Sequence, residues 1–99
     1  MPTYLVIIQP EAELDLDEAY EYLEGQQIGL GFELLAEIAD AITVLEETPF
    51  LFQKNHDEKR RFFLQRFKYN LIYKVVNANV YILAIIYGNR NPSRWEDRN

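Results

Sequence analysis

The spacing of apolar residues changes once along the chain, and this change limits the possible folds more than any other feature. Between Pro10 and Pro49 the apolar residues recur at helical spacing. Between Arg60 and Tyr87 they alternate or run continuously, which is typical of β-strands. A further β-rich run, Thr3–Gln9, comes before the helical part and ends at a proline. The pattern predicts one strand, two helices and then three strands.

Two amphipathic helices are expected in the first half. Pro10 suits the first turn of one helix, and Gly25 suits its end. The apolar face of this helix is predicted to hold Ala12, Leu16, Ala19, Tyr20 and Leu23. Its opposite, solvated side is predicted to hold Glu13, Asp17, Glu21 and Glu24. For the second helix the predicted apolar stripe is Phe32, Leu35, Ile38, Ala39, Ile42 and Leu45. A short connection makes an antiparallel helical hairpin.

Three strand-like runs fill the second half. They are Arg60–Phe67, Tyr69–Val76 and Val80–Tyr87. The short Asn-rich turn Asn77–Asn79 joins the last two runs as a β-hairpin. Because the last run is apolar on both faces, we expect it to be a central strand. Residues 1–99 therefore predict one α+β domain of order β-α-α-β-β-β, with the helical hairpin packed on a mostly antiparallel sheet.

Charge divides the chain into two unequal halves. Residues 1–53 hold twelve acidic and no basic side chains, whereas residues 54–99 hold ten basic and four acidic ones, so the halves carry about −12 and +6. The asymmetry indicates either a polarised surface with a charged partner or two solvated faces that partly neutralise each other. The absence of cysteine excludes disulfides and thiolate chemistry. No signal peptide or run long enough to span a bilayer is evident, so a cytoplasmic protein without membrane partners is expected.

Few residues suggest small-molecule chemistry. The acidic run ELDLDEAYEYLE lacks the glycine-centred spacing of a calcium loop, and His56 has no Ser or Cys partner nearby in sequence. We therefore expect no metal and no cofactor. Basic residues of the second half interleave with aromatic ones, as in Arg61, Phe63, Arg66 and Phe67. That pattern suits phosphate and base contacts, but it equally suits a half-buried strand.

The tail after Tyr87 holds three arginines and the single tryptophan. Trp95 is predicted to pack the tail against the sheet. Arg90 is the first candidate for contact with a target, and Arg94 is a second. Arg98 is expected to pair with the acidic helices, and the same pairing is the alternative to target contact for Arg94.

Several segments, taken in order, resemble the RelE/ParE superfamily of toxins from type II toxin–antitoxin modules. They are PEAELDLDEAYEYLE, GLGFELLAEIADAI, TPFLF, RRFFLQRFKYNLIYKV and ILAIIYGNRNPSRW. The resemblance covers nearly the whole chain and implies the same β-α-α-β-β-β fold. It implies one of two activities. RelE-like members are ribosome-dependent endoribonucleases, and ParE-like members poison DNA gyrase without a nuclease site.

The resemblance also assigns residues. Arg61 lies near one basic position of the RelE-like nucleases, and Arg90 matches their arginine after the last strand. Two positions depart from that pattern, because Asn70 replaces an arginine and Phe63 replaces a lysine. Trp95 falls close to the terminal aromatic position of these nucleases. RNA cleavage needs a proton acceptor, a proton donor and cations for the phosphorane, and Trp95 has no titratable proton. These losses favour the ParE-like alternative.

We therefore expect a ParE-like, gyrase-directed toxin of a plasmid-stabilisation type that a cognate antitoxin binds and neutralises. The expected target-binding residues are Arg90, Arg94 and Arg66. Two alternatives stay open: a ribosome-dependent messenger-RNA nuclease that uses Arg61 and Arg90, and a non-toxic binding module on the same fold. Monomer and homodimer stay open as well.

Overall fold

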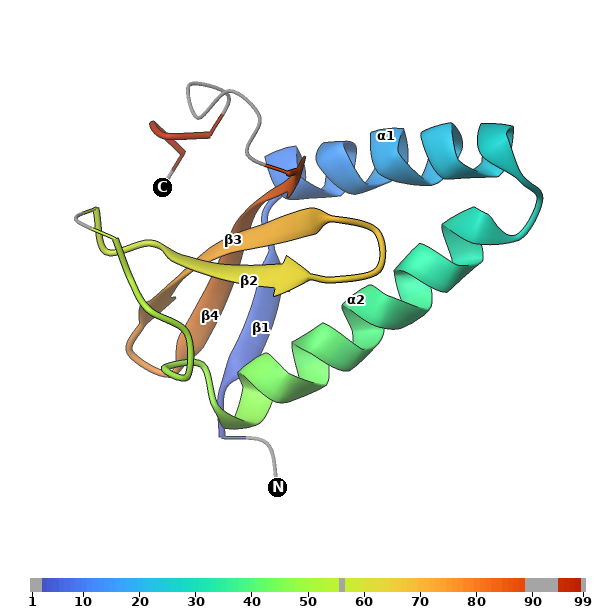
Figure 1. The fold of residues 1–99 in the computed structure, drawn as a ribbon. Coiled ribbons are helices and arrows are strands. Elements are labelled where there is room, and N and C mark those ends of the chain that lie inside the picture. The colour runs from blue at the N-terminus through green and yellow to red at the C-terminus, as the bar shows by residue number, and fades with distance from the viewer. Residues whose placement is uncertain (1–2, 56, 89–94, 99) are drawn as a thin grey trace.

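A computed structural model describes residues 3–55, 57–88 and 95–98. The elements follow the predicted order (Figure 1). They are β1 (Leu5–Ile8), α1 (Pro10–Gln26), α2 (Leu30–Glu47), β2 (Arg60–Leu64), β3 (Tyr69–Val76) and β4 (Asn79–Tyr87). The α+β class and the helical hairpin are confirmed. Neither described helix is both long and apolar enough to cross a membrane.

The sheet has the strand order β1-β4-β3-β2. β4 is central, as predicted, and only its pairing with β1 is parallel. The hairpin turn is shorter than expected, because Asn79 already belongs to β4 and Asn77 takes a positive φ of 56°. β1 pairs only with Asn79–Ile82, so no described strand lies beside the second half of β4 on that side. Leu83 forms a β-bulge in β4. Ile72 pairs with Ala84, and the next residue, Tyr73, pairs with Ile82.

The predicted apolar face of α1 is confirmed. Ala12, Ala19 and Leu23 are buried, Leu16 is half-buried against the core, and Tyr20 is half-buried. These side chains pack with those of α2 and one face of the sheet, which includes Leu71, Tyr73, Val80 and Ile82. Glu24, however, was wrongly placed on the solvated side. It is half-buried, and its Oε1 accepts hydrogen bonds from the N–H groups of Gly29 (2.9 Å) and Gly31 (2.8 Å), which lie at the start of α2.

The stripe predicted for α2 is only partly correct. Its buried positions are Gly31, Leu34, Ile38, Ala41 and Leu45. Phe32 and Ala39 were predicted to face the core, but both are exposed. The cause is a close contact between the helices, because a Cβ atom placed on Gly31 would lie 2.6 Å from the ring of Tyr20. Gly31 therefore faces α1, and the rings of Phe32 and Tyr20 form a T-shaped pair at 5.6 Å between centroids.

Candidate functional site

Two of the four predicted site arginines lie within the described residues. Arg61 is an exposed residue of β2, and Arg66 lies in the turn between β2 and β3. Arg66 forms an ion pair with Glu33 of α2, and its guanidinium lies 4.7 Å from the centre of the Phe67 ring. Arg90 and Arg94 lie outside the described residues. The structure therefore places Arg61 in β2 and Arg66 in the turn that follows β2. It does not test how these two residues lie relative to Arg90 and Arg94.

Arg61 lies in a basic pocket of about 290 Å³ at the start of β2. We call this the basic pocket. Its four cationic side chains are Lys54, Lys59, Arg60 and Arg61, and its apolar wall is made by Ile72 and Trp95. Among the described residues that line it, none carries a carboxylate or an imidazole. The pocket can therefore attract an anion, but these residues supply no ordinary proton acceptor for RNA cleavage.

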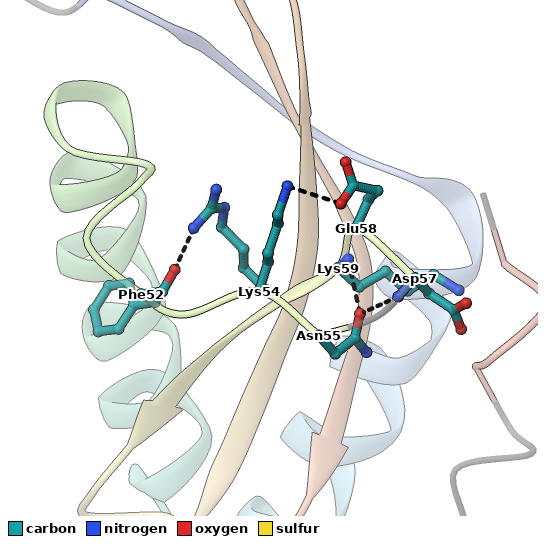
Figure 2. A network of polar contacts seen from close by, with 7 residues as sticks. Phe52, Lys54, Asn55, Asp57, Glu58 and Lys59 are labelled. Carbon is teal, nitrogen blue, oxygen red and sulfur yellow. Dashed lines mark hydrogen bonds and ion pairs between the residues drawn. The ribbon is translucent and has the colours of Figure 1, made fainter.

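Polar contacts order the loop between α2 and β2, which contributes residues to the basic pocket (Figure 2). The N–H groups of Asp57 and Lys59 donate to Asn55 Oδ1 at 2.9 and 3.0 Å, which fixes a tight turn. Lys54 Nζ pairs with Glu58 Oε2 at 2.8 Å across this turn. The pKa of Glu58 is lowered, first by the hydrogen bond from Lys54 and then by the Lys54 and Arg60 charges.

Two cations of the pocket have fixed partners. Lys59 is buried, donates to the Glu96 carbonyl, and places its Nζ 5.9 Å from the centre of the Trp95 ring. Arg60 donates to the Phe52 carbonyl at 2.5 Å, and its guanidinium lies 4.9 Å from the Phe50 ring. The sequence periodicity does not predict the burial of Lys59, because this burial depends on contacts with the tail residues Trp95 and Glu96.

Asn70 and Phe63 are direct cross-strand partners in β3 and β2. Asn70 is buried, and its Nδ2 donates to the Gly88 carbonyl at 2.6 Å. The amide thus holds the point where the chain leaves β4. Phe63 is partly exposed, and the Nζ of Lys68 lies 5.8 Å from its ring centre. Neither residue supplies the cation that RelE-like nucleases have at these positions.

Trp95 packs the tail against the sheet, as predicted. It is buried and forms a small apolar cluster with Ile72, Ala84 and Ile86. We call this the tryptophan cluster. It is separate from the larger core that α1 and α2 cover. The ring therefore covers part of the sheet face on which Arg61 pairs with Ile72 across β2 and β3.

Arg98 pairs with an acidic helix, as predicted, but its partner was not foreseen. The partner is Asp15 of α1, whose Oδ2 lies 2.7 Å from Arg98 Nη1. The same carboxylate oxygen accepts the N–H of Ile85 at 3.0 Å, and Arg98 donates to the Leu83 carbonyl at 3.0 Å. Asp15 and Arg98 thus satisfy the edge of β4 that β1 is too short to reach. Asp15 recurs with Ala12 and Ala19 on the apolar face, and an acid at such a position was the available signal.

A second and larger concavity runs between α1 and the second half of β4. We call this the α1–β4 groove. Its volume is about 430 Å³. It is lined by two carboxylates, three tyrosines and aliphatic groups, namely Asp15, Glu18, Ala19, Tyr22, Tyr69, Ile85, Ile86 and Tyr87. Tyr22 and Tyr87 are well exposed there. The lining has the apolar and acidic character that suits a basic, amphipathic peptide.

Tyr73 is a buried tyrosine of β3 with a raised pKa. Burial raises its pKa to about 12, and its hydroxyl donates to the Pro49 carbonyl at 2.7 Å. The side chain lies in the helix-covered core rather than at the basic pocket. It therefore serves as a structural hydrogen-bond donor that ties the end of α2 to β3, and it is not placed to deliver a proton to a ligand of the basic pocket.

Comparison with known proteins agrees with this geometry. A family model described as "ParE toxin of type II toxin-antitoxin system, parDE" matches residues 6–92. No curated protein matches the chain. A solved structure, "Chromosomal ParDE TA system from P. aeruginosa", contains a chain that is similar with a TM-score of 0.77 and 15% sequence identity. The match covers 88% of the present chain and 98% of that chain, and at this identity it shows the fold alone.

The family match extends from β1 through β4 into the tail, so it takes in α1, α2 and the strands that carry the basic pocket. The resemblance to the RelE/ParE superfamily and the prediction of a toxin of a type II module are confirmed. The chain belongs to the ParE toxin family of type II toxin–antitoxin systems.

Proposed function

We propose that this chain is a gyrase-directed toxin that a cognate antitoxin neutralises in the cytoplasm. The observation that carries the proposal is the ParE family match over residues 6–92. The chemistry of the sheet supports it. Asn70 and Phe63 leave two RelE-like cation positions empty, and the described lining of the basic pocket holds no carboxylate or imidazole.

A supercoiling assay tests the target directly. Addition of the purified toxin to DNA gyrase at micromolar concentration should stop supercoiling, and the cognate antitoxin should restore it. Ribosome-bound messenger RNA should stay intact under the same conditions. Ribosome-dependent cleavage that is lost in Arg61→Ala or Arg90→Ala would instead establish the nuclease alternative.

The target-binding arginines form the finer part of the proposal. We expect Arg66→Ala and Arg90→Ala each to weaken gyrase inhibition, because each removes a cation from the basic half of the chain. Lys74→Ala provides a matched control, since it removes a cation from β3 at a half-buried position away from the β2–β3 turn that carries Arg66. Equal losses in all three variants would indicate a general charge effect, and would contradict a local contact.

For the antitoxin we propose the α1–β4 groove as the docking site. An amphipathic segment with basic residues would place apolar side chains on Tyr22 and Ile86 and its cations near Glu18. The surrounding α1 surface is strongly acidic, which complements such a segment.

Co-purification with the antitoxin tests this groove. Glu18→Lys should weaken the complex and reduce its sensitivity to salt, because it reverses one charge in the groove. Glu47→Lys makes the same charge change at an exposed position near the end of α2, away from the groove. If both variants bind the antitoxin equally well, the segment docks elsewhere.

A further inference from the structure

β1 lies at one edge of the sheet, because β4 is its only neighbour among the described strands. The N–H groups of Leu5 and Gln9 donate to carbonyl groups of the β3–β4 hairpin at 3.0 Å. Because backbone groups alternate in direction along a strand, the N–H and C=O groups of Val6 and Ile8 point away from the sheet. No hydrogen bond within the described residues engages these outward groups. We call them the free edge of β1.

The chain closes this free edge at both ends. Tyr4 would supply the next outward N–H, but it donates to the Glu46 carbonyl near the end of α2 at 3.0 Å. At the other end Pro10 has no N–H and begins α1. The free edge is therefore confined to Val6 and Ile8.

β1 lacks the usual protection of an edge strand. Natural proteins protect such strands with a lysine, a proline, a bulge or a covering segment. β1 reads LVII, carries no charge and pairs with β4 in a regular register. Val6 and Ile8 pack against the core, whereas Leu5, which is 63% exposed, and Ile7 point to the opposite face of the sheet. An uncharged, apolar edge of this kind is a template for another strand.

We propose that β1 pairs antiparallel with β1 of a second copy of this chain, about a twofold axis beside Ile7. In this register Val6 of each copy lies opposite Ile8 of the other, and the two residues exchange backbone hydrogen bonds. The symmetry satisfies both outward positions of both copies at once. The strand carries no charge that would repel a copy or select a partner of opposite charge. A second copy therefore fits this edge better than a charged foreign segment.

The dimer should be weak and dependent on concentration. A strand of 4 residues presents much less area than the roughly 1,200–2,000 Å² of stable interfaces. Each copy also carries a net charge of −6, so the copies repel each other at low ionic strength, and moderate salt should strengthen the dimer by screening. None of the described residues that line the α1–β4 groove or the basic pocket belongs to β1, so pairing uses a separate surface.

A single introduced cysteine tests the register, because the chain has no cysteine of its own. The two Ile7 residues would form a non-hydrogen-bonded antiparallel pair, whose Cα atoms lie about 4.5 Å apart, within the range of roughly 4.4–6.8 Å for a disulfide. Under mild oxidation Ile7→Cys should therefore form a linked dimer at least about tenfold faster than Ile28→Cys. Ile28 is the matched control, because it is 91% exposed in the connection between the helices. Equal rates would overturn the proposed register.

Hydrogen exchange tests the pairing without a substitution. As the concentration of the purified chain rises, the Val6 and Ile8 amides should become protected. The Leu5 and Gln9 amides, which are already bonded to the neighbouring hairpin, should change little. Exchange of the Val6 and Ile8 amides that is the same at all concentrations would contradict the pairing.

Charge substitutions provide a complementary test by sedimentation velocity. Ile7→Lys and Ile7→Glu should each lower the association constant at least about fivefold, because like charges then lie opposite each other, and a mixture of the two variants should restore association. Ile28→Lys should have no such effect, and thermal melting checks that each variant is folded.

Two further results would overturn the proposal. One is a chain that remains monomeric at millimolar concentration. The other is protection of the Val6 and Ile8 amides only after the antitoxin is added, which would assign this edge to the antitoxin. The tests on the purified chain involve neither gyrase nor antitoxin, so their outcome is independent of the proposed toxin activity.

Discussion

The two faces of the sheet are built in different ways. One face is covered by α1 and α2 and carries most of the core, including Leu34, Leu45, Leu71 and Tyr73. On the other face the only apolar cluster among the described buried residues is the tryptophan cluster, with cations beside it. The first face depends on many mutually packed side chains, whereas the second depends on one aromatic ring. This difference indicates that packing on the helix-covered face determines the fold, so the residues of the other face are freer to be substituted.

Insertion of a charge should produce the largest difference in stability between the two faces of the sheet. Leu34→Asp places an unpaired carboxylate where the side chain is fully buried, at 0% exposure. Such a change costs more than about 4–5 kcal/mol, so the variant should be unfolded at 25 °C. Circular dichroism measures this, with exposed Leu51→Asp as the matched control. A folded Leu34→Asp protein would show that the helices do not form the main core.

The ion pair between Asp15 and Arg98, which we call the Asp15–Arg98 clasp, should make the second largest contribution to stability. Asp15→Ala leaves the Ile85 N–H and the Arg98 guanidinium without their carboxylate, and we expect a loss of about 3 kcal/mol in unfolding free energy. Arg98→Ala should cost less, because Asp15 keeps its bond to Ile85 and the Arg98 side chain is partly exposed. Urea denaturation of both variants and of the double variant gives the coupling between them. Purely additive losses would mean that the two side chains act separately.

Trp95→Ala tests the open face of the sheet. Removal of a core tryptophan usually costs roughly 3–5 kcal/mol, but this cluster has only three other buried members, so we expect about 2 kcal/mol. Trp95→Phe should retain more than half of that stability. Chemical denaturation followed by circular dichroism is the suitable measurement, because both variants lose the fluorophore. A loss as large as that of Leu34→Ala would make the two faces equivalent.

A smaller effect is expected where the helices touch. Gly31→Ala adds a methyl group 2.6 Å from the Tyr20 ring and 2.9 Å from the Glu24 Cγ, so one of them must move. Overpacking of this kind costs about 1–3 kcal/mol, and the helix propensity of alanine returns about 1 kcal/mol. Thermal melting should therefore show a net loss of about 1 kcal/mol. Gly25→Ala, where nothing lies within 4 Å, should instead be neutral or stabilising.

The smallest effect concerns the pKa of one carboxyl beside the basic pocket. Glu58 has a pKa below its usual value of 4.5, mainly because of Lys54. Because the pKa is lowered in the folded state, any stability that this pair adds is present at neutral pH and is lost as the pH falls through that pKa. Lys54→Gln should raise the pKa of Glu58 toward 4.5, as followed by carbon-13 NMR, and Lys74→Gln should leave it unchanged. An unchanged value in Lys54→Gln would remove Lys54 as the cause.

Periodicity predicted the elements well because the strands and α1 are set by local alternation and spacing. It failed for the rotation of α2, since Gly31 has no side chain to mark the contact that turns the helix toward Tyr20. It also missed Asp15 and Lys59, whose burial depends on tail residues far away in sequence. Trp95 was predicted correctly, because a large ring after the last strand has few other places to pack. The tail positions Arg90 and Arg94 stay predictions.

The parallel pairing of β1 with β4 has a consequence for the time course of folding. Leu5 must wait for Asn79, its partner, and the chain between them takes about 4–15 s to synthesise at roughly 5–20 residues per second. The helical hairpin ends at Glu47, so in the later part of that interval it has been synthesised but has no sheet to cover. Contacts between residues so distant in sequence also slow folding itself, toward the millisecond-to-second range. The native sheet therefore forms only after β4 has been synthesised, and the Asp15–Arg98 clasp closes after it.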